Sequence, residues 1–472
     1  MLNKTKIVCT IGNSSEPEEV MEQMLLAGMD AIRLNFGYGD INSLTKYVVT
    51  AKKLALIHGK PLAIMLDTYG PKIKTHSFAD GEATIGKGCK VTIHTKEETL
   101  GNSDSFSVNY PGLYSVVKTD DIILVNGYRL RILKKNAKTK TLECEALNSF
   151  TVKDETFVNL PNILTDIPYV NNKDRARIDL AADLNLDFLV ASFVRNKQDI
   201  LDVKEVLKAK NSNLKVVAKI ENAIAVKNFD EILEVADGIM IARGDLSVEV
   251  PLEDIPVIQK YIVQKCNEAG KFVVVSTQIL SSMTRNKKPS RAEVSDVATA
   301  VWDGLDAIML SDVTAIGKYP VKGVETLAAI SSRIEKEIDY RGRLIRSKFN
   351  PNKSLNDAVA LSVAETALDI DAKLIIAFTE SGETARRISK IRPCCPIAAV
   401  TSKEDVRLSL QLNWGVHPVV SNQPTNEKDY HTKACEIAAY YGVKEGESVI
   451  ITGGNGHGNT NFMKVIKLWN MQ

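Results

Sequence analysis

Short apolar runs recur along the first two thirds of the chain, and their spacing constrains the fold more than any other feature. Six of the seven intervals between their first residues are 23 to 35 residues long, which suits one strand–helix unit. Most of the runs lack polar alternation, as expected of strands that are buried on both faces of a parallel sheet. Eight such units close into a (β/α)8 barrel. The predicted barrel strands are residues 6–12, 31–36, 62–67, 188–194, 215–221, 238–243, 272–278 and 307–312.

One interval departs from this register. From Leu62 to Phe188 the chain runs for 126 residues, whereas one unit needs about thirty. The extra segment, residues 71–158, carries alternating short runs and many lysine, threonine and glycine residues. It predicts a small β-barrel domain inserted after the third strand, placed above the barrel mouth as a lid. The catalytic barrel is then discontinuous and consists of residues 1–70 and 159–345.

The pattern changes again after about residue 345. A polar break at 346–356 precedes a helix-like stretch at 357–370. Helices and strands then alternate, which predicts a separate C-terminal domain over residues 346–472. The expected fold class is therefore α/β: a (β/α)8 TIM barrel with an inserted small β-barrel lid domain and a C-terminal α/β domain. The strand-like runs of the C-terminal domain are residues 373–379, 396–402, 416–421 and 448–454.

Composition and charge exclude several classes of function. The formal net charge of the 472 residues is +2, which gives no general attraction to nucleic acid or to an anionic membrane. No stretch approaches about 20 uninterrupted apolar residues, so we expect no membrane span. The N-terminal residues also lack the apolar core of a signal peptide. The seven cysteines are odd in number and form no CxxC pair, which argues against a disulfide framework or zinc site and favours a cytoplasmic protein.

Polar side chains stand at the ends of several predicted strands. Lys219 and Glu221 are two residues apart in one strand and therefore point to the same side. In a (β/α)8 barrel the active-site groups gather at the carboxyl ends of the strands. The alternative is that these polar residues only cap the helices that follow. The strand-end residues are Asn35, Asp67, Lys219, Glu221, Asp245, Thr277 and Asp312.

Glu221 and Asp245 are carboxylates at adjacent strand ends, and such a pair suits Mg²⁺ or Mn²⁺. The alternative is a structural network in which they pair with Lys219, Arg243 or Arg33. Lys219 beside a divalent metal would meet an anion that both cations contact, and Arg33 adds a planar fork suited to phosphate or carboxylate. Two side-chain cations and a metal imply a small substrate with several negative charges. Phosphoryl transfer needs this arrangement, because it depends on positioning and charge neutralisation.

With these residues in place, the chain resembles the pyruvate kinase family over essentially its whole length. The resemblance implies transfer of the phosphoryl group of phosphoenolpyruvate to ADP in glycolysis. It also implies a barrel, a lid, a C-terminal effector and interface domain, and a homotetramer. The order and density of the matches make the resemblance specific. Among the matching segments are KTKIVCTIG (4–12), LDTYGPKIKT (66–75), AKIEN (218–222), DGIMIARGDL (237–246) and STQIL (276–280).

The resemblance also implies roles at the phosphoenolpyruvate side of the site. Lys219 would stabilise the charge that develops as the phosphoryl group leaves. Arg33 would grip the transferring phosphate. Glu221 and Asp245 would ligate Mg²⁺ (or Mn²⁺), with Asp245 also on the substrate-binding side.

Further roles concern the substrate carboxylate and the nucleotide. The backbone of Gly244 and the hydroxyl of Thr277 would hold the carboxylate, and Thr277 would also help to relay a proton to the enolate carbon. ADP, on a second Mg²⁺, would accept the phosphoryl group. The positions that correspond to nucleotide contacts are Asn35 and Lys74.

The chain departs from the family at the potassium site. The family motif NFSHG reads NFGYG here (35–39), so Gly37 replaces a serine whose hydroxyl is a potassium ligand. The other ligand positions correspond to Asn35, Asp67 and Thr68. The family motif DTKGPEIRT reads DTYGPKIKT (67–75), and potassium-independent members carry lysine at the position of Lys72. An ammonium there takes the electrostatic role of the ion and repels it. We therefore expect activity that does not require K⁺.

The nucleotide side departs further. The arginine of the family pattern is Lys74, which loses bidentate geometry. Thr156 replaces a lysine and Tyr38 a histidine, while the loop MLSGETA reads MLSDVTA (309–315). We favour an active but divergent pyruvate kinase, because the phosphoenolpyruvate side is intact. The alternative is a paralogue with weak or no transferase activity and a binding or regulatory role. A metal-dependent aldolase is less favoured, because those enzymes lack the large lid and the C-terminal domain.

The C-terminal domain contains a candidate anion site in the loop TESGETARR (379–387). Thr379, Ser381, Gly382 and Thr384 could cradle an effector phosphate at a helix N-terminus. The alternative is a capped helix start, with Thr379 or Ser381 as the N-cap. Glu383 opposes a phosphate electrostatically, so we expect weak or no activation by a sugar bisphosphate. A second glycine-rich stretch, 453–461, is a weaker signal.

Overall fold

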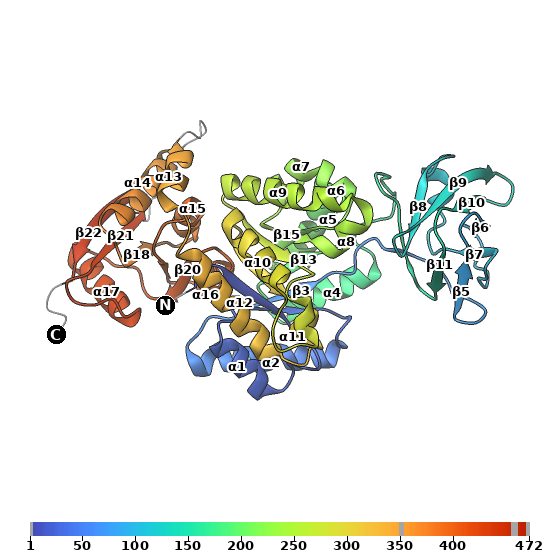
Figure 1. Cartoon of the computed structure of the whole chain (residues 1–472). Helices are drawn as coiled ribbons and strands as arrows, with labels where there is room; N and C mark the ends of the chain where they lie inside the picture. The colour runs from blue at the N-terminus through green and yellow to red at the C-terminus, as the bar shows by residue number, and fades with distance from the viewer. Residues whose placement is uncertain (1–2, 349–353, 455–460, 469–472) are drawn as a thin grey trace.

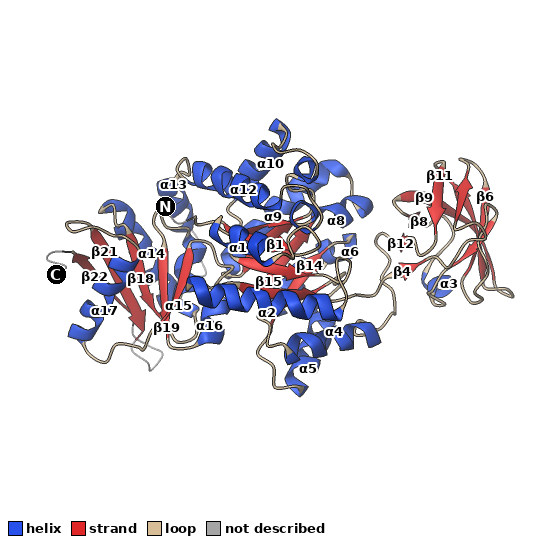
Figure 2. Cartoon of the chain, turned by 90° about the horizontal axis from the view of Figure 1, so that it is seen from below, coloured by secondary structure: helices blue, strands red, loops and turns tan. Residues whose placement is uncertain are grey.

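A computed structural model describes residues 3–348, 354–454 and 461–468. Its centre is a closed barrel of parallel strands in the order β1-β17-β16-β15-β14-β13-β3-β2, surrounded by helices (Figure 1; Figure 2). The predicted (β/α)8 barrel is thereby confirmed, including the interruption between its third and fourth strands. The barrel strands are β1 (Lys6–Thr10), β2 (Ala31–Leu34), β3 (Ala63–Asp67), β13 (Phe188–Ala191), β14 (Lys215–Ile220), β15 (Gly238–Ala242), β16 (Phe272–Ser276) and β17 (Ala307–Leu310).

Alternation along each strand decides which side chains enter the barrel. In β14, Val217 belongs to the cluster that fills the barrel interior, whereas Val216 and Ala218 pack outward against the helices. Phe188 and Phe272 meet edge to face inside the barrel, with ring centroids 5.5 Å apart. The period of two then carries Lys219 inward above Val217, toward the carboxyl end. The apolar filling closes the lower barrel, so the polar strand ends line the open mouth.

Capping residues set where the outer helices begin and end. Helix α10, for example, starts with a capping box between Ser290 and Glu293 and ends at Gly304, whose φ is +91°. Apolar residues of the longer helices, such as Ile262 and Val263 of α9, join the cluster that surrounds the barrel strands. The helices of this layer are α1 (Glu18–Leu26), α2 (Ile41–His58), α4 (Asn172–Asp183), α5 (Lys197–Ala209), α6 (Ala223–Lys227), α7 (Phe229–Val235), α8 (Arg243–Glu249), α9 (Ile255–Ala269), α10 (Arg291–Asp303), α11 (Asp312–Ala315) and α12 (Pro320–Glu335).

The segment between β3 and β13 folds into sheets of its own, with a separate apolar core. It stands at the opposite end of the barrel from the C-terminal sheet (Figure 1). One sheet has the order β4-β12-β8-β9-β10-β6-β7, and β11 pairs with β5. Sequence patterns did not predict the short strands β4, β5, β11 and β12. The elements are β4 (Ile73–Lys74), β5 (Glu82–Ile85), β6 (Lys90–His94), β7 (Ser105–Ser107), α3 (Leu113–Val116), β8 (Ile122–Val125), β9 (Tyr128–Asn136), β10 (Thr141–Ala146), β11 (Phe150–Lys153) and β12 (Phe157–Asn159).

The C-terminal part forms a five-stranded sheet with the order β20-β19-β18-β21-β22. All its pairs are parallel except β21 with β22, and β22 was not predicted. Leu412 joins the cluster inside the barrel, and Arg392 pairs with Asp306 at 2.8 Å, so this part packs on the lower end of the barrel. Its elements, with the preceding helix, are α13 (Tyr340–Lys348), α14 (Leu355–Asp369), β18 (Leu374–Phe378), α15 (Glu383–Ile391), β19 (Ile397–Thr401), α16 (Glu404–Ser409), β20 (Val416–Val420), α17 (Glu427–Tyr440), β21 (Ser448–Gly454) and β22 (Asn461–Lys467).

Three sequence expectations concern cysteines, membrane spans and loops. All seven cysteines are free thiols. Among the described residues, no helix combines the length and apolar character that crossing a membrane requires. Residues 349–353 of the predicted polar break and 455–460 of the glycine-rich stretch lie outside the part of the chain that the structure describes.

Candidate active site

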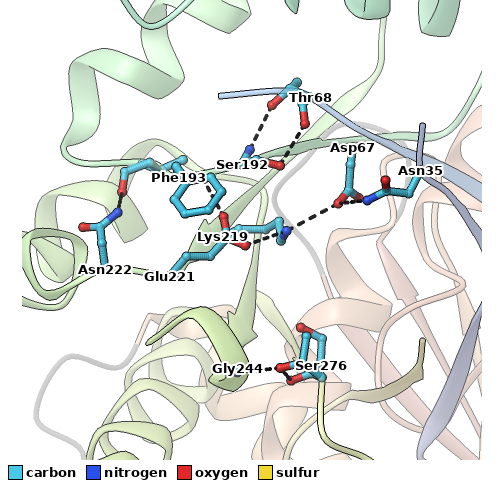
Figure 3. A network of polar contacts seen from close by, with 12 residues as sticks. Asn35, Asp67, Thr68, Ser192, Phe193, Lys219, Glu221, Asn222, Gly244 and Ser276 are labelled. Carbon is cyan, nitrogen blue, oxygen red and sulfur yellow. Dashed lines mark hydrogen bonds and ion pairs between the residues drawn. The ribbon is translucent and has the colours of Figure 1, made fainter. Parts of the chain in front are cut away.

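The barrel mouth holds a buried cluster of charges around Asp67. Arg33 donates to Asp67 through Nε, at 3.0 Å from Oδ1, and through Nη2. Lys219 Nζ lies 3.4 Å from Asp67 Oδ2, and Asn35 Nδ2 donates to the same oxygen at 3.3 Å (Figure 3). Burial pushes the pKa of Asp67 upward, but the charges of Arg33 and Lys219 outweigh it and lower this pKa to about 2. Asp67 is therefore ionised and fixes two cations at the mouth.

Lys219 also contacts Glu221, as their shared side of the strand predicted. Lys219 Nζ lies 2.6 Å from Glu221 Oε1, and the other carboxylate oxygen accepts a 2.6 Å hydrogen bond from the backbone N–H of Phe193 (Figure 3). Burial lowers the pKa of Lys219, but Glu221 and Asp67 outweigh it and raise the pKa above its usual value. The ammonium is therefore charged. Of the ion pairs in the structural-network alternative, Lys219 with Glu221 is present, whereas Arg243 pairs with Asp296.

Asp245 lies in the first turn of α8, beside Glu221. Its side chain is open to solvent within the crowded mouth. Desolvation by the surrounding atoms, followed by the charge of Glu221, raises the pKa of Asp245 to about 6. Glu221 and Asp245 are thus close enough for their negative charges to repel one another.

A divalent cation fits these two side chains. Glu221 Oε1 is buried and lies 2.6 Å from the ammonium of Lys219 without a well-directed hydrogen bond, so a bound cation would share this carboxylate with Lys219. Within the described residues no group of three or more His, Cys, Asp or Glu side chains gathers as a metal cage. A site with two carboxylates and remaining positions for water and substrate oxygens is the type that Mg²⁺ uses with phosphorylated substrates.

Gly244 and Thr277 meet on the other side of the mouth. The N–H of Gly244 donates to Thr277 Oγ1 at 2.7 Å, and this hydroxyl donates to the carbonyl of Ser276 at 2.6 Å. A Cβ at Gly244 would come within 3.2 Å of Thr277 Oγ1, and the φ of Thr277 is +63°. The structure thus brings both predicted carboxylate-binding groups together in a tight, directed arrangement.

Arg243 supports this loop, a role that the sequence analysis missed. Its guanidinium is buried and donates to Asp296 at 2.7 and 2.8 Å. Nη2 also donates to the carbonyls of Thr277 and Gln278, at 3.3 and 3.4 Å. The available signal was its place directly before Gly244 and Asp245, where a barrel strand ends.

Side-chain oxygens at the predicted potassium-ligand positions accept hydrogen bonds from the chain's own backbone. Thr68 Oγ1 accepts from the N–H of Ser192 at 2.9 Å, and Asn35 Oδ1 accepts from the N–H of Gly37 at 2.7 Å. Lys72 lies nearby: burial lowers the pKa of its ammonium, and Glu221 is the charge that opposes this effect most strongly. The ammonium of Lys72 therefore acts on the same carboxylates as Lys219.

On the nucleotide side, two of the substituted residues contact each other. Tyr38 donates from its hydroxyl to Asp312 Oδ1 at 2.5 Å, which joins two departures from the family pattern. Lys74 Nζ lies 2.9 Å from Glu155 Oε2. The two predicted nucleotide positions, Asn35 and Lys74, thus have different partners. A cavity of about 160 Å³ separates the inserted sheet from the mouth. Lys72, Asn126, Phe157, Asn222, Asp245 and Glu249 are among its lining residues.

The predicted anion loop of the C-terminal part is largely satisfied by its own atoms. Thr379 Oγ1 accepts from the N–H of Gly382 at 3.0 Å, and the carbonyl of Ser381 accepts from Arg386 at 2.5 Å. The helix starts at Glu383 with Gly382 as its N-cap and no side-chain cap. The expectation that Thr379 or Ser381 is the N-cap is therefore wrong, because Gly382 adopts the left-handed conformation at that position.

Comparison with known proteins decides the family. A family model described as "Pyruvate kinase, barrel domain" matches residues 2–324, and one described as "Pyruvate kinase, alpha/beta domain" matches residues 357–466. The chain belongs to the pyruvate kinase family. A pyruvate kinase from Clostridium perfringens is 38% identical over 99% of this chain and 100% of its own length. One from Geobacillus stearothermophilus is 41% identical over 98% of this chain and 80% of its own length.

A solved structure agrees with these sequences. The crystal structure of a pyruvate kinase from Cryptosporidium parvum matches with a TM-score of 0.93 and 36% identity, over 99% of this chain and 96% of that one. The protein is accordingly an enzyme, a phosphotransferase with pyruvate kinase function. The comparisons favour neither the paralogue without transferase activity nor the aldolase. Pyruvate kinases generally need a divalent metal and usually K⁺, and they bind phosphoenolpyruvate and ADP.

Proposed function

We propose that this enzyme transfers the phosphoryl group of phosphoenolpyruvate to ADP, giving pyruvate and ATP in glycolysis. The observation that carries the proposal is the ammonium of Lys219, which lies between Asp67 and Glu221 at 3.4 and 2.6 Å and is almost fully buried. A fixed cation in low-dielectric surroundings stabilises negative charge far better than the same cation in water. That is what an enolate leaving its phosphoryl group requires.

Glu221 and Asp245 would hold Mg²⁺ or Mn²⁺. When bound, such an ion would hold the substrate and polarise the enolate oxygen. The buried carboxylate of Glu221 and the open carboxylate of Asp245 beside it support this assignment. The charges of Glu221 and Asp67 raise the pKa of Lys219 and keep it protonated, so Glu221 serves the lysine as well as the metal.

Arg33 grips the transferring phosphate in this proposal. Asp67 holds Nε and Nη2 of Arg33 and fixes the plane of the guanidinium. Nη1 donates to the hydroxyl of Thr10 over a longer 3.3 Å, which leaves this group as the one best placed to turn to a phosphate oxygen.

Gly244 and Thr277 bind the substrate carboxylate. The N–H of Gly244, now donated to Thr277, would be donated to a carboxylate oxygen, and the hydroxyl of Thr277 would donate to the same group. The contacts of Arg243 with the Thr277 carbonyl support this loop in position. Thr277 would then help to pass a proton to the enolate carbon.

The same proposal extends to ions and nucleotide. The ammonium of Lys72 replaces K⁺, so activity does not require the ion. Asn35, Asp67 and Thr68 stand at the potassium-ligand positions but bind no K⁺ in this proposal. Asn35 and Lys74 remain the candidate nucleotide contacts. The ion pair of Lys74 with Glu155 must open for that role, which supports altered nucleotide affinity.

The remaining features are proposed from the family resemblance. The domains are 1–70 with 159–345, 71–158, and 346–472, and the enzyme is a cytoplasmic homotetramer. Thr379, Ser381, Gly382 and Thr384 form at most a weak effector site. The ion pair of Glu383 with Arg387 at 2.5 Å adds a negative charge and ties up a cation at the loop.

A coupled assay tests the function. Pyruvate release is followed with lactate dehydrogenase and NADH, with ADP, GDP and other nucleoside diphosphates as acceptors. We expect turnover with Mg²⁺ and equal rates in K⁺ and in an organic cation of the same ionic strength. Folded protein that turns over none of the acceptors would favour the paralogue. A large activation by K⁺ would contradict only the role of Lys72.

A further inference from the structure

The ammonium of Lys72 is surrounded by three aromatic rings that come from three parts of the chain. The distances from Nζ to the ring centroids are 5.2 Å for Tyr69, 5.2 Å for Phe157 and 5.0 Å for Phe193. Each lies within the roughly 6 Å over which a cation is attracted to a ring face. We call Tyr69, Phe157 and Phe193 the aromatic cage.

Two walls of the aromatic cage are fixed to the barrel. The N–H groups of Tyr69 and Gly70 donate to the buried carboxylate of Asp174, at 2.6 and 3.0 Å. The φ of Gly70 is +77°, and a Cβ there would lie only 2.5 Å from the carbonyl of Ser192. The segment after β3 therefore packs directly against the residue that precedes Phe193.

The wall formed by Phe193 is tied to the candidate metal ligand. Its N–H donates to Glu221 Oε2 at 2.6 Å (Figure 3), and its φ of +54° is rare for an aromatic residue. The hydrogen bond and the unusual backbone conformation together hold the ring beside Lys72. The ring that faces the ammonium and the carboxylate that faces Lys219 are thus one rigid unit.

The third wall belongs to the inserted sheet. Phe157 opens strand β12 and pairs with Lys74 of β4, while Asn159 of the same strand donates to Glu249 of the barrel at 3.0 Å. Phe157 is 45% exposed, so it adds little to the core of its own sheet. Its position therefore depends on how the inserted sheet lies against the barrel.

The aromatic cage places the charge of Lys72 close to the charged groups of the active site. The carboxylates that act on its ammonium are Glu221, Asp245 and Asp67, and Lys219 is the cation that opposes it. A long lysine side chain has considerable freedom, which three rings restrict without supplying a negative charge. The charge is therefore available to the carboxylates and to an anionic substrate rather than neutralised by a partner.

We propose that the aromatic cage positions the ammonium of Lys72 as the built-in monovalent cation of the active site, and that Phe157 makes this charge depend on the placement of the inserted sheet. Tyr69, Phe157 and Phe193 are positioning residues in this account, because they act through Lys72. The proposal rests on the proposed role of Lys72 in place of K⁺.

A double-mutant cycle tests the cage. We expect Phe157→Leu to lower kcat/KM for phosphoenolpyruvate about three- to thirty-fold, the range that a partly buried cation–ring contact supports. In a Lys72→Met background the same change should cost clearly less, because of the two cations at this ring only Lys74, at 5.3 Å, remains. Phe157→Tyr should retain the wild-type value. Equal losses in both backgrounds, or a loss with Phe157→Tyr as large as with Phe157→Leu, would overturn the proposal.

The control is Tyr114→Leu, which removes a ring of helix α3 in the inserted segment that faces Lys135 and Lys140 at 4.5 Å. It should leave kcat/KM unchanged in both backgrounds. A second variant, Tyr69→Leu, repeats the cycle from the barrel side if Phe157→Leu is poorly folded. Lys173 and Arg177 also face the Tyr69 ring, so a Tyr69→Leu loss of equal size with and without Lys72 would count against the cage.

Potassium titrations separate this proposal from the one on which it rests. Wild type should show no activation by K⁺, whereas Lys72→Met should gain it and Phe157→Leu should gain part of it. If wild type itself requires K⁺, the replacement of the ion by Lys72 is wrong, and the cycle at constant K⁺ still decides whether the rings position the lysine. If wild type is potassium-independent and the cycle is additive, only the cage fails.

Discussion

Asp67 holds the charge cluster of the mouth together, and its replacement by asparagine gives a magnitude that can be worked out. The side chain is almost fully buried between Arg33 and Lys219. Burial raises its pKa and the two cations lower it, for a net change from 3.8 to about 2. That change corresponds to about 2 to 3 kcal/mol of folding free energy. An asparagine side chain would keep the shape and leave two buried cations sharing one remaining carboxylate, Glu221.

The expected result for Asp67→Asn is a lower melting temperature. At about 2 to 4 °C per kcal/mol for a domain of this size, the loss is roughly 5 to 10 °C, measured by scanning calorimetry on the barrel transition. The folded-state pKa lies below the unfolded one, so the contribution is fully present above about pH 4 and is lost as the pH falls toward 2. The difference in melting temperature between Asp67→Asn and wild type should therefore be constant from pH 8 to pH 5.

A matched control is Asp312→Asn, which changes an exposed carboxylate at the same mouth. Its hydrogen bond with Tyr38 is at the surface, so its loss should cost less than about 1 kcal/mol. If Asp67→Asn melts within about 1 °C of wild type while Asp312→Asn does the same, the two cations do not depend on Asp67, and the account of the cluster is refuted.

Two further predictions concern a buried acid and a supporting arginine. Burial raises the pKa of Asp187 to about 7, so the fold loses stability as the pH rises from about 4 to 7. Asp187→Asn should therefore raise the melting temperature most at pH 8, less at pH 5, and leave it unchanged near pH 3. An equal gain at all three pH values would exclude this explanation. Arg243→Lys should lower kcat about tenfold or more with a small change in stability, because a single ammonium cannot hold Asp296 and the Thr277 and Gln278 carbonyls together; unchanged steady-state kinetics would show that the Thr277 loop needs no such support.

The barrel was predictable because its strands are buried on both faces. Runs such as residues 215–221 stay apolar until the carboxyl end, and the period of two then places Lys219 and Glu221 on the inner side beside one another. The same logic identified Asp67 and Asp245. The short strands β4, β5, β11 and β12 were missed, because two to four residues give no readable alternation.

Contacts between segments that are distant in the sequence could not be predicted from it. Nothing local links Tyr69 and Lys72 with Phe157 and Phe193, which approach only after the inserted sheet has folded against the barrel. The support that Arg243 gives to Thr277 likewise depends on Asp296, more than fifty residues away. The left-handed backbone at Phe193 and Gly382 was also invisible, and for Gly382 it changed the predicted helix cap.

The central claim is that the buried ammonium of Lys219 stabilises the charge of the departing enolate, and Lys219→Met tests it most directly. The measurement is kcat for transfer from phosphoenolpyruvate to ADP at saturating substrates, with Lys215→Met at the lower end of the same strand as the control. We predict a loss of about a thousandfold or more for Lys219→Met and wild-type turnover for Lys215→Met. A Lys219→Met enzyme that is folded, binds phosphoenolpyruvate and retains a kcat within tenfold of wild type would contradict the account.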